Sequence, residues 1–379
     1  MIPSGPLPTP CLLLDSVRLD GNARRLRERA ESLGVRFRPH LKTAKSIDVA
    51  LRVMTTPSGP GMVSTLREAD YFAALGVRDL IYGVGIAPGK LDAVGAIRER
   101  HAADLAIILD SVEQAVAVAE WSRAHAHRLP ALIEIDADGH RSGVTPGEAE
   151  TLVAIGQVLH QGAAELRGVL THAGGSYALS RPRDIEAAAA TERDAVVGCA
   201  AILRAAGLPC PVVSVGSTPT ATFAKDLTGV TELRAGVFMF GDLVQAGIGA
   251  CGIDDIALSV LATVIGHQPA KGWAIVDAGW MALSRDRGTS RQAVDQGYGL
   301  VCDADGIAYP ELIVLDANQE HGIVGVRPGS DRTLPDLPLG SLVRILPNHA
   351  CATAAQYDRY HVLAPGGGIA ATWPRINGW

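Results

Sequence analysis

The chain has 379 residues, of which 47% are hydrophobic, 20% are charged and 42 are glycine. The length predicts two to three domains, and one long domain with a smaller one also fits. The composition is typical of a globular protein and excludes a disordered or fibrous chain. The 34 basic residues are outnumbered by 40 acidic residues, so the formal net charge is −6. Since no segment concentrates the basic residues, a general nucleic-acid-binding or membrane-surface role is disfavoured.

Membrane and export signals are not apparent. No apolar run reaches the roughly 18 residues of a membrane span, and the first residues contain no basic region of a leader peptide. The six cysteines form no CxxC pair, and a chain of this length needs no disulfide staples. We therefore expect a cytoplasmic protein with reduced cysteines.

Eight apolar, β-type runs alternate with stretches of helical character. They are VRFRPH at 35, GMVSTL at 61, DLIYGV at 79, LAIILD at 105, ALIEID at 131, RGVLTH at 167, VVSVGS at 212 and TELRAG at 231. Apolar strands joined by helical crossovers indicate a parallel sheet that is buried on both faces. Eight such units favour an α/β fold of the (β/α)8 TIM-barrel type, which we assign to residues 18–250.

The pattern changes after residue 255 to strand-like runs separated by turn signals. These runs are ALSVLATVIGHQ, WAIVDAG, YGLVCDADG, LIVLDANQEHGIV and SLVRILPNHA. They predict an all-β domain over residues 251–379. The opening segment PTPCLLLD is a further strand, and residues 1–17 could pair with this domain and make it discontinuous.

Polar and ionisable residues follow several barrel strands directly. The first strand ends in RPHLKT, with His40 and Lys42; the fifth ends in DADGHRSG, with Arg141; the sixth ends in THAGGSY, with His172 and Tyr177. Active-site residues of such barrels lie where strands end and loops begin. We therefore expect these side chains at one common rim.

The last two barrel strands end in Gly216-Ser217-Thr218-Pro219-Thr220 and in Arg234-Ala235-Gly236. Free backbone N–H groups at such ends could hold an anion, and the loops after strands 7 and 8 are the recurrent phosphate site of these barrels. An ordinary turn with a helix N-cap is the alternative. The position in the barrel favours the phosphate site.

Lys42 is the candidate for a Schiff base with a phosphate-bearing cofactor. Burial and nearby cations activate such lysines by lowering their pKa, and Arg38, His40 and Lys45 lie within a few residues. The alternative is a solvated surface lysine, the most common fate of this residue type.

The strings TPCLLLD, HLKTAKS, EIDADGHRSGV, LTHAGGSY, VVSVGSTPT, LSVLATVIG, DAGWMALSRDRG and ANQEHG resemble one enzyme family. It comprises the pyridoxal-phosphate enzymes of the alanine-racemase fold (fold type III), in the branch of D-serine dehydratases and D-threonine aldolases. Within that branch the strings look most similar to the D-threo-3-hydroxyaspartate dehydratases. The resemblance covers the chain from Pro8 to Trp379.

The resemblance implies a role for each matching residue. Lys42 would form the Schiff base with pyridoxal 5'-phosphate, Arg141 would contact the cofactor's phenolic oxygen, and His172 would lie beneath its ring. Arg234 matches the arginine that faces the pyridine nitrogen in racemases, although aldolases of the branch can lack it. The remaining cofactor contacts would come from Tyr177, Gly216, Ser217, Thr218, Gly236 and Val237.

A possible metal site follows the strand SLVRILP. In an extended segment residues two apart share a face, so the His349 imidazole and the Cys351 thiolate could bind one cation. The pair falls short of the four ligands of a structural zinc site, and a buried cysteine near a capping histidine is the alternative. Two ligands would leave positions open, as a catalytic metal requires.

The resemblance favours the metal site, because dehydratases of this branch carry His-x-Cys here and bind a divalent metal. The aldolases commonly have a carboxylate in place of Cys351. A thiolate with an imidazole favours Zn²⁺, with Mn²⁺, Co²⁺ and Mg²⁺ as alternatives. His40, Gln319 and His321 are candidate substrate contacts, although the last two could equally lie in an exposed polar turn.

We expect a lyase that dehydrates D-configured β-hydroxy amino acids. D-threo-3-hydroxyaspartate would give oxaloacetate and ammonia, and D-serine would give pyruvate. The nearest alternative is a D-threonine aldolase that forms glycine and an aldehyde. A racemase is disfavoured by the metal pair, and a non-catalytic pyridoxal-phosphate carrier is disfavoured because such single-domain proteins lack the β-domain. By analogy we expect a homodimer.

Overall fold

The computed structural model describes residues 7–366 and 368–379. The chain divides into two compact units. One unit, the barrel unit, comprises Arg25–Gly236 with Gly378–Trp379; the other, the β unit, comprises the described residues up to Arg24 and Val237–Asn377. Residues 1–6 of the predicted β-domain lie outside the described part of the chain.

The unit boundaries differ from the expected ones at residues 17/18 and 250/251. The amide of Asn22 donates to the carbonyls of Met239 and Asp255 at 3.1 and 2.9 Å, and Arg18 donates to Ile256 at 3.0 Å. The first turns of helix α1 (Ser16–Ser32) therefore belong to the β unit. Helical propensity carries no signal for such tertiary contacts, which is why the sequence placed the boundary at the start of the helix.

The barrel unit contains eight parallel strands in the order β2-β9-β8-β7-β6-β5-β4-β3. A bridge between His40 and Met62, with the Leu41 N–H donating to the Met62 carbonyl at 2.7 Å, joins the two outer strands. The predicted (β/α)8 barrel is thus confirmed. The strands are β2 (Arg36–Pro39), β3 (Gly61–Val63), β4 (Asp79–Gly85), β5 (Asp104–Leu109), β6 (Pro130–Ile135), β7 (Glu165–Thr171), β8 (Val212–Val215) and β9 (Glu232–Ala235).

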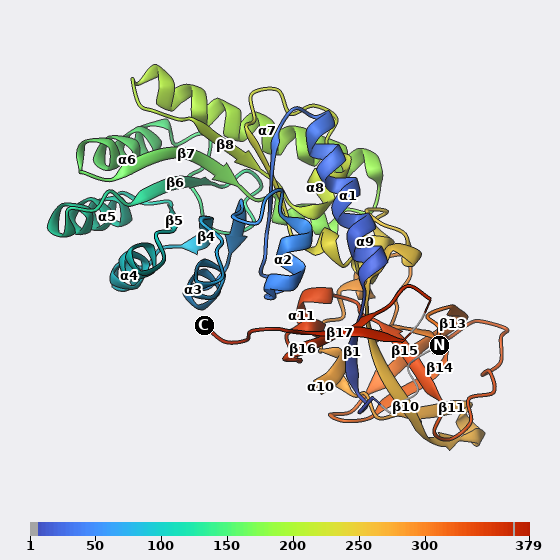
Figure 1. The fold of residues 1–379 in the computed structure, drawn as a ribbon. Coiled ribbons are helices and arrows are strands. Elements are labelled where there is room, and N and C mark those ends of the chain that lie inside the picture. Colours follow the sequence, from blue (N-terminus) through green and yellow to red (C-terminus); the bar gives the residue numbers. More distant parts are fainter. Residues whose placement is uncertain (1–6, 367) are drawn as a thin grey trace. The chain divides into compact units, whose positions relative to one another are not determined.

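Helices cover the outside of these strands (Figure 1). Several begin at side-chain caps that the sequence encodes locally: Ser111 forms a capping box with Gln114, and the Thr65 hydroxyl accepts the Glu68 N–H. The helices are α2 (Ile47–Val53), α3 (Leu66–Ala74), α4 (Leu91–His101), α5 (Val112–His125), α6 (Ala149–Gln161), α7 (Pro182–Ala205) and α8 (Thr218–Phe223).

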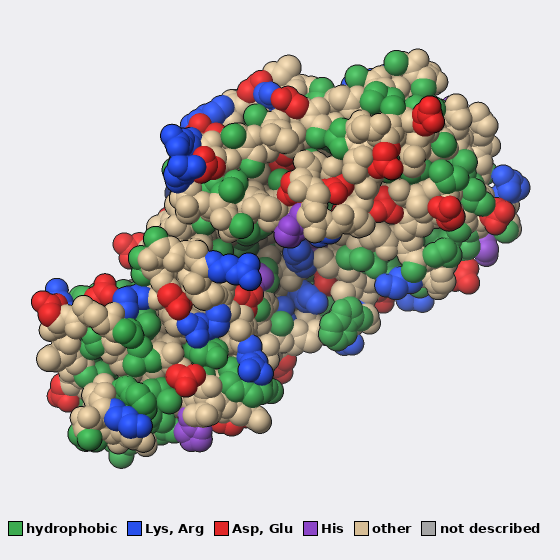
Figure 2. Space-filling view, turned by 180° about the vertical axis from the view of Figure 1, so that it is seen from behind, with side chains coloured by type: hydrophobic (Ala, Val, Ile, Leu, Met, Phe, Trp, Pro, Cys, Tyr) green, Lys and Arg blue, Asp and Glu red, His purple; other side chains and the backbone are tan. Residues whose placement is uncertain are grey.

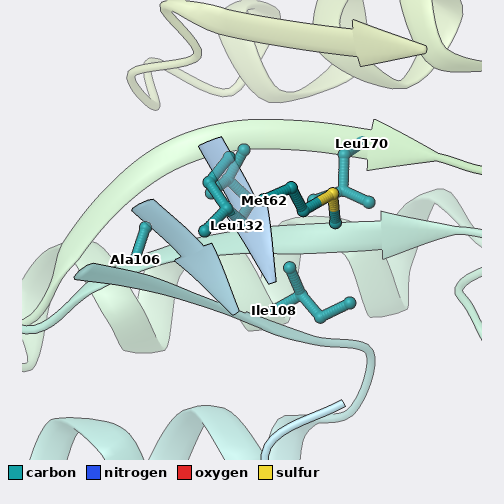
Figure 3. Packing of buried hydrophobic residues seen from close by; sticks show 6 residues of the cluster. Met62, Ala106, Ile108, Leu132 and Leu170 are labelled. Atoms are coloured by element: carbon teal, nitrogen blue, oxygen red, sulfur yellow. The ribbon is translucent and has the colours of Figure 1, made fainter. Parts of the chain in front are cut away.

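Apolar side chains from adjacent strands fill part of the barrel interior (Figure 3). Each is at most 3% exposed, and burial of one such side chain stabilises a fold by roughly 1.5–3 kcal/mol. This packed interior keeps the reactive residues at the ends of the strands instead of inside the barrel. The cluster comprises Met62, Ile81, Ala106, Ile108, Leu132 and Leu170.

The β unit is built on a nine-stranded sheet in the order β11-β14-β13-β12-β15-β10-β1-β16-β17. The N-terminal strand β1 pairs antiparallel with β10 and parallel with β16. The strands are β1 (Cys11–Asp15), β10 (Leu258–Gln268), β11 (Trp273–Val276), β12 (Leu300–Cys302), β13 (Ala308–Ala317), β14 (Gly322–Val326), β15 (Leu342–Leu346), β16 (Arg359–Leu363) and β17 (Ile369–Pro374).

Short helices interrupt this sheet, and one of them differs from the sequence-based expectation. Residues 350–354 form helix α11 (Ala350–Ala354) instead of extending the strand SLVRILP. The unit also contains the short helices α9 (Leu243–Gly247) and α10 (Trp280–Leu283). The run LIVLDANQEHGIV also forms two strands, β13 and β14, with a turn between them.

Charged side chains of both signs are interspersed on the face drawn in Figure 2. Among the helices of the described residues, none combines the length and the hydropathy that a bilayer crossing demands.

Candidate active site

Lys42 lies in the loop that follows β2, and its side chain is exposed. Its backbone N–H donates to Nδ1 of His40 at 3.4 Å, so the His40 proton belongs on Nε2, which lies 3.4 Å from the Ser64 hydroxyl. Burial and the positive charges of Lys42 and Arg234 lower the pKa of His40 well below its ordinary value. A neutral imidazole therefore lies beside the lysine.

Two of the cations expected near Lys42 are paired elsewhere. Arg38 is buried and donates to Glu232 at 2.8 Å and to Asp79 at 2.7 Å. Lys45 lies 3.1 Å from the fully buried Glu68. Each positive charge is thus balanced by a carboxylate, which weakens the expectation that these two residues activate Lys42.

His172 follows β7, and its Nδ1–H donates to the carbonyl of Gly216 at 2.9 Å. Because a carbonyl only accepts, this bond places the proton on Nδ1 and leaves Nε2 unprotonated. Burial lowers the pKa of His172 to about 3, and the charges of Arg141 and Lys42 act in the same direction. The Tyr177 ring centre is 6.3 Å from that of His172, at an interplanar angle of 49°.

Arg234 projects from β9 and is 4% exposed. Its Nε donates to the Ser214 hydroxyl at 2.9 Å, and its other nitrogens contact the Thr171 carbonyl and the Met62 sulfur. The Ser214 hydroxyl in turn donates to Glu232 at 2.9 Å. Burial lowers the pKa of Arg234, although carboxylates including Glu232 oppose the shift. The guanidinium is therefore held by residues of three other barrel strands, β8, β7 and β3.

Arg141 lies in the loop after β6, and its side chain is 48% exposed. One guanidinium nitrogen lies 3.4 Å from Glu134, whose pKa is raised by burial. This loop contacts the loop after β7, because Asp138 accepts the Gly175 N–H at 2.8 Å. The structure thus brings Arg141 to the same end of the barrel as the ends of β6 and β7.

The segment predicted to bind phosphate forms a tight loop after β8. Gly216 has a φ of +134°, and a Cβ at this position would lie 2.0 Å from the Arg234 carbonyl, so only glycine fits. Ser217 caps α8 and forms a capping box with Thr220. The expectation that the N–H groups here are free is wrong for two residues, because Gly216 donates to Glu192 at 3.0 Å and Ser217 donates to the Thr220 hydroxyl at 3.0 Å.

Thr218 begins α8, and Gly236 ends the barrel unit. A Cβ on Gly236 would lie 3.1 Å from the Thr43 hydroxyl, so β9 ends close to the loop that carries Lys42. Val237 belongs to the β unit. The roles of these three residues at a phosphate stay predictions.

The barrel site fits an anionic cofactor that carries an aldehyde. Lys42 offers an exposed amine, His172 and His40 are neutral, and Arg141 and Arg234 supply positive charge toward the same end of the barrel. Positive charge suits a phosphate, and neutral imidazoles can contact a ring without adding further charge. These are the requirements of pyridoxal phosphate.

The predicted metal pair lies in the β unit, at the start of a helix and not in a continuous extended segment. His349 is the N-cap residue of α11, and Cys351 is in the first turn of this helix. Their side chains are nevertheless close enough for hydrogen bonding. Burial opposes protonation of His349, but hydrogen bonds to Asp286 and Cys351 raise its pKa to about 11.

Two carboxylates support this pair. Asp286 Oδ2 accepts from His349 Nδ1 at 2.7 Å, which leaves Nε2 for a cation. Asp242 accepts the N–H of Ala350 at 3.0 Å and caps α9. In the described residues no group of three or more His, Cys, Asp and Glu side chains could hold a metal. Imidazole and thiolate fit Zn²⁺, with further coordination positions left to other ligands.

Gln319 and His321 lie in the turn between β13 and β14, with exposed side chains. The Asn318 N–H donates to the His321 carbonyl at 2.8 Å and closes the turn. A role in substrate binding stays a prediction for both residues.

Sequence reasoning missed three carboxylates that support the predicted residues. Glu192 lies in the middle of α7, and Asp242 and Asp286 precede short helices or turns. Asp286 follows a recognisable string, DAGWMALSR, but nothing in its spacing indicates a bond to His349. Contacts between residues tens of positions apart leave no periodic signal in one sequence.

Known proteins match both parts of the chain. Residues 14–244 match the family model described as alanine racemase, N-terminal domain, and residues 257–363 match the model described as putative serine dehydratase domain. The chain is 52% identical over 375 residues to D-threo-3-hydroxyaspartate dehydratase from Delftia sp. (strain HT23), with 98% of each chain covered. The solved structure of that enzyme matches with a TM-score of 0.95, again over 98% of both chains.

More distant relatives include a dehydratase and an aldolase. D-serine dehydratase from Dictyostelium discoideum is 30% identical over 94% of this chain and 93% of its own. D-threonine aldolase from Arthrobacter sp. is 28% identical over 94% of this chain and 89% of its own. The chain therefore belongs to the D-serine dehydratase-like branch of the alanine-racemase-fold family.

Proposed function

We propose that this protein is a pyridoxal-phosphate- and divalent-metal-dependent dehydratase of D-configured β-hydroxy amino acids. The preferred substrate is D-threo-3-hydroxyaspartate, which gives oxaloacetate and ammonia, and D-serine is a further substrate that gives pyruvate. The observation that carries this proposal is the 52% identity, over 98% of both chains, to an enzyme of that name.

The His349–Cys351 pair adds further support. Solved structures of D-threo-3-hydroxyaspartate dehydratase include a histidine-to-alanine variant and a cysteine-to-alanine variant, the latter described as metal-free, and the altered residues are two positions apart. His349 and Cys351 have the same spacing. We assign them as ligands of a divalent metal, with Zn²⁺ favoured by the thiolate.

The barrel residues would perform the proton chemistry. The exposed Lys42 amine would hold the cofactor and, as a free amine, would remove the α-proton of the substrate. Arg141 would contact the phenolic oxygen of the cofactor, Arg234 would face its pyridine nitrogen, and the neutral His172 would lie beneath its ring without adding charge. When bound, pyridoxal phosphate supplies an electron sink for the α-carbon, and the divalent metal supplies a Lewis acid for the β-hydroxyl.

An aldolase is the second candidate, because D-threonine aldolase from Arthrobacter sp. also aligns over most of the chain. It would cleave the Cα–Cβ bond and release glycine with an aldehyde. The lower identity, 28% against 52%, and the thiol at position 351 favour dehydration.

The deciding experiment supplies the purified enzyme with Zn²⁺ or Mn²⁺ and offers D-threo-3-hydroxyaspartate, D-serine and D-threonine separately. We expect ammonia and a 2-oxo acid, with the fastest release from D-threo-3-hydroxyaspartate. Glycine and an aldehyde as the main products would overturn the dehydratase proposal in favour of the aldolase. Absence of any product from a cofactor-loaded protein would favour a carrier.

We also propose a homodimer in the cytoplasm. None of the six cysteines, all of which lie in the described residues, forms a disulfide, as expected in a reducing compartment. The dimer rests on analogy with the family, and sedimentation of the purified chain would test it.

A further inference from the structure

Glu192 is a buried carboxylate for which neither the motifs nor the proposed chemistry has a use. It lies in the middle of the long helix α7 and is 2% exposed. Buried carboxylates are rare unless they have partners that compensate for the lost hydration. The partners of Glu192 are therefore informative.

One oxygen of Glu192 accepts two backbone hydrogen bonds from two different loops. Its Oε1 accepts the Ala173 N–H at 3.1 Å, in the loop after β7, and the Gly216 N–H at 3.0 Å, in the loop after β8. The Thr220 hydroxyl also bonds to this carboxylate. One side chain from a helix thus connects the ends of two adjacent strands.

Both backbone groups belong to residues that are linked directly to His172. Ala173 is its neighbour in the chain, and Gly216 supplies the carbonyl that accepts the Nδ1–H of His172 at 2.9 Å. Gly216 is therefore held on both sides, by Glu192 at its N–H and by His172 at its carbonyl. The glycine has a φ of +134° and no side chain of its own that could fix this conformation.

We infer that Glu192 is a positioning residue that fixes the tautomer and the orientation of His172 by holding Ala173 and Gly216 in place. The importance of His172 for catalysis rests on the proposed function, whereas the hydrogen bonds themselves do not. The two backbone hydrogen bonds to Oε1 depend on the length of the Glu192 side chain more than on its negative charge. A glutamine, with an acceptor oxygen at the same distance, should therefore replace it.

Two variants separate the effect of side-chain length at position 192 from the effect of negative charge, and a third variant is the control. Glu192→Asp keeps the charge but shortens the side chain by one methylene, Glu192→Gln keeps the reach but removes the charge, and Glu186→Ala is the control. Glu186 lies on the same helix and pairs at the surface with Lys225 at 3.2 Å. Thermal unfolding of each variant would show whether it folds.

The measurement is the pair of ring-nitrogen resonances of His172 in full-length protein labelled with 15N-histidine, with and without added pyridoxal phosphate. His172→Gln assigns the signals. In the wild type, in Glu192→Gln and in Glu186→Ala, we expect two well-separated resonances of a single Nδ1–H tautomer. In Glu192→Asp we expect the two resonances to move toward each other, as in a mixture of tautomers.

Hydrogen exchange provides a second test, in the wild type first and then in Glu192→Asp. The Ala173 and Gly216 amides should both be protected, and in Glu192→Asp their exchange should be about tenfold faster, as for the loss of one buried hydrogen bond. Unprotected amides in the wild type, or a single tautomer in Glu192→Asp, would overturn the inference. Mixed tautomers in Glu192→Gln would also overturn it, because charge would then be decisive. Failure of the protein to bind pyridoxal phosphate would leave these signals readable and would count only against the proposed function.

Discussion

His172 illustrates how a single residue makes stability depend on pH. Burial lowers its pKa to about 3 in the folded protein, whereas an unfolded chain has a histidine pKa of about 6.5. Between these values the unfolded chain binds a proton that the folded protein does not bind. The free energy of unfolding therefore decreases as the pH falls from about 6.5 toward 3.

Replacing His172 by Gln should remove this contribution. From pH 7 to pH 5 we expect the wild type to lose on the order of 1–2 kcal/mol more stability than the variant, in urea unfolding curves measured at both pH values. Equal losses in the two proteins would show that His172 is protonated in the folded state at pH 5.

At Gly216 the surrounding atoms leave no room for a side chain. A Cβ there would lie 2.0 Å from the Arg234 carbonyl, and the φ of +134° is unfavourable for any other residue. We expect Gly216→Ala to lower the free energy of unfolding by about 3 kcal/mol. Gly34→Ala is the control, because Gly34 has a φ of +70° but open space around it, and should cost only about 1 kcal/mol. Similar losses for both variants in urea unfolding would mean that the loop after β8 can move to accept a side chain.

At the level of secondary-structure elements, the sequence predicted the barrel strands correctly, but it did not predict the conformation around residue 349. Each of the eight apolar runs is a strand, because strands buried on both faces need continuous apolar residues. The segment from Ala350 became a helix, and in such a short element tertiary contacts outweigh local preference. One such contact is the Asp242 carboxylate, which accepts the Ala350 N–H from 108 positions away along the chain. The extended geometry predicted for His349 and Cys351 was thus wrong for Cys351, and their role as metal ligands stays a prediction.

Helix α3 allows a buried and an exposed carboxylate to be compared within one element. Glu68 is fully buried, lies 3.1 Å from the Lys45 ammonium and accepts the Ser64 N–H at 2.9 Å. Glu68→Ala would leave a largely buried cation without its partner, so we expect the free energy of unfolding to fall by about 3 kcal/mol.

The exposed member of this comparison is Asp70, whose side chain is 44% exposed and pairs with Arg100 and His101. Asp70→Ala should cost less than about 1 kcal/mol, because water screens such pairs. Urea unfolding of both variants checks the difference. Equal effects would indicate that water replaces Glu68 beside Lys45.

At the scale of the whole molecule, the two candidate sites lie in different units. Lys42 and its neighbours belong to the barrel unit, and His349 and Cys351 belong to the β unit. Each unit has a buried apolar cluster of its own, around Met62 in the barrel and around Leu300 in the β unit. Damage to one site should therefore leave the fold and the ligand of the other site intact.

This independence predicts the behaviour of two variants. Lys42→Ala should lose the visible absorbance of lysine-bound pyridoxal phosphate but keep its metal, because no ligand of the metal pair has changed. Cys351→Ala should keep the absorbance. It should lose the metal, because a lone imidazole binds a divalent cation weakly, and with the metal it should lose the chelator-sensitive part of its turnover. Absorbance spectra and elemental analysis of the same dialysed samples measure both properties. Loss of cofactor and metal together in either variant would show that the two units hold their ligands cooperatively, and an unchanged chelator response in Cys351→Ala would place the metal elsewhere.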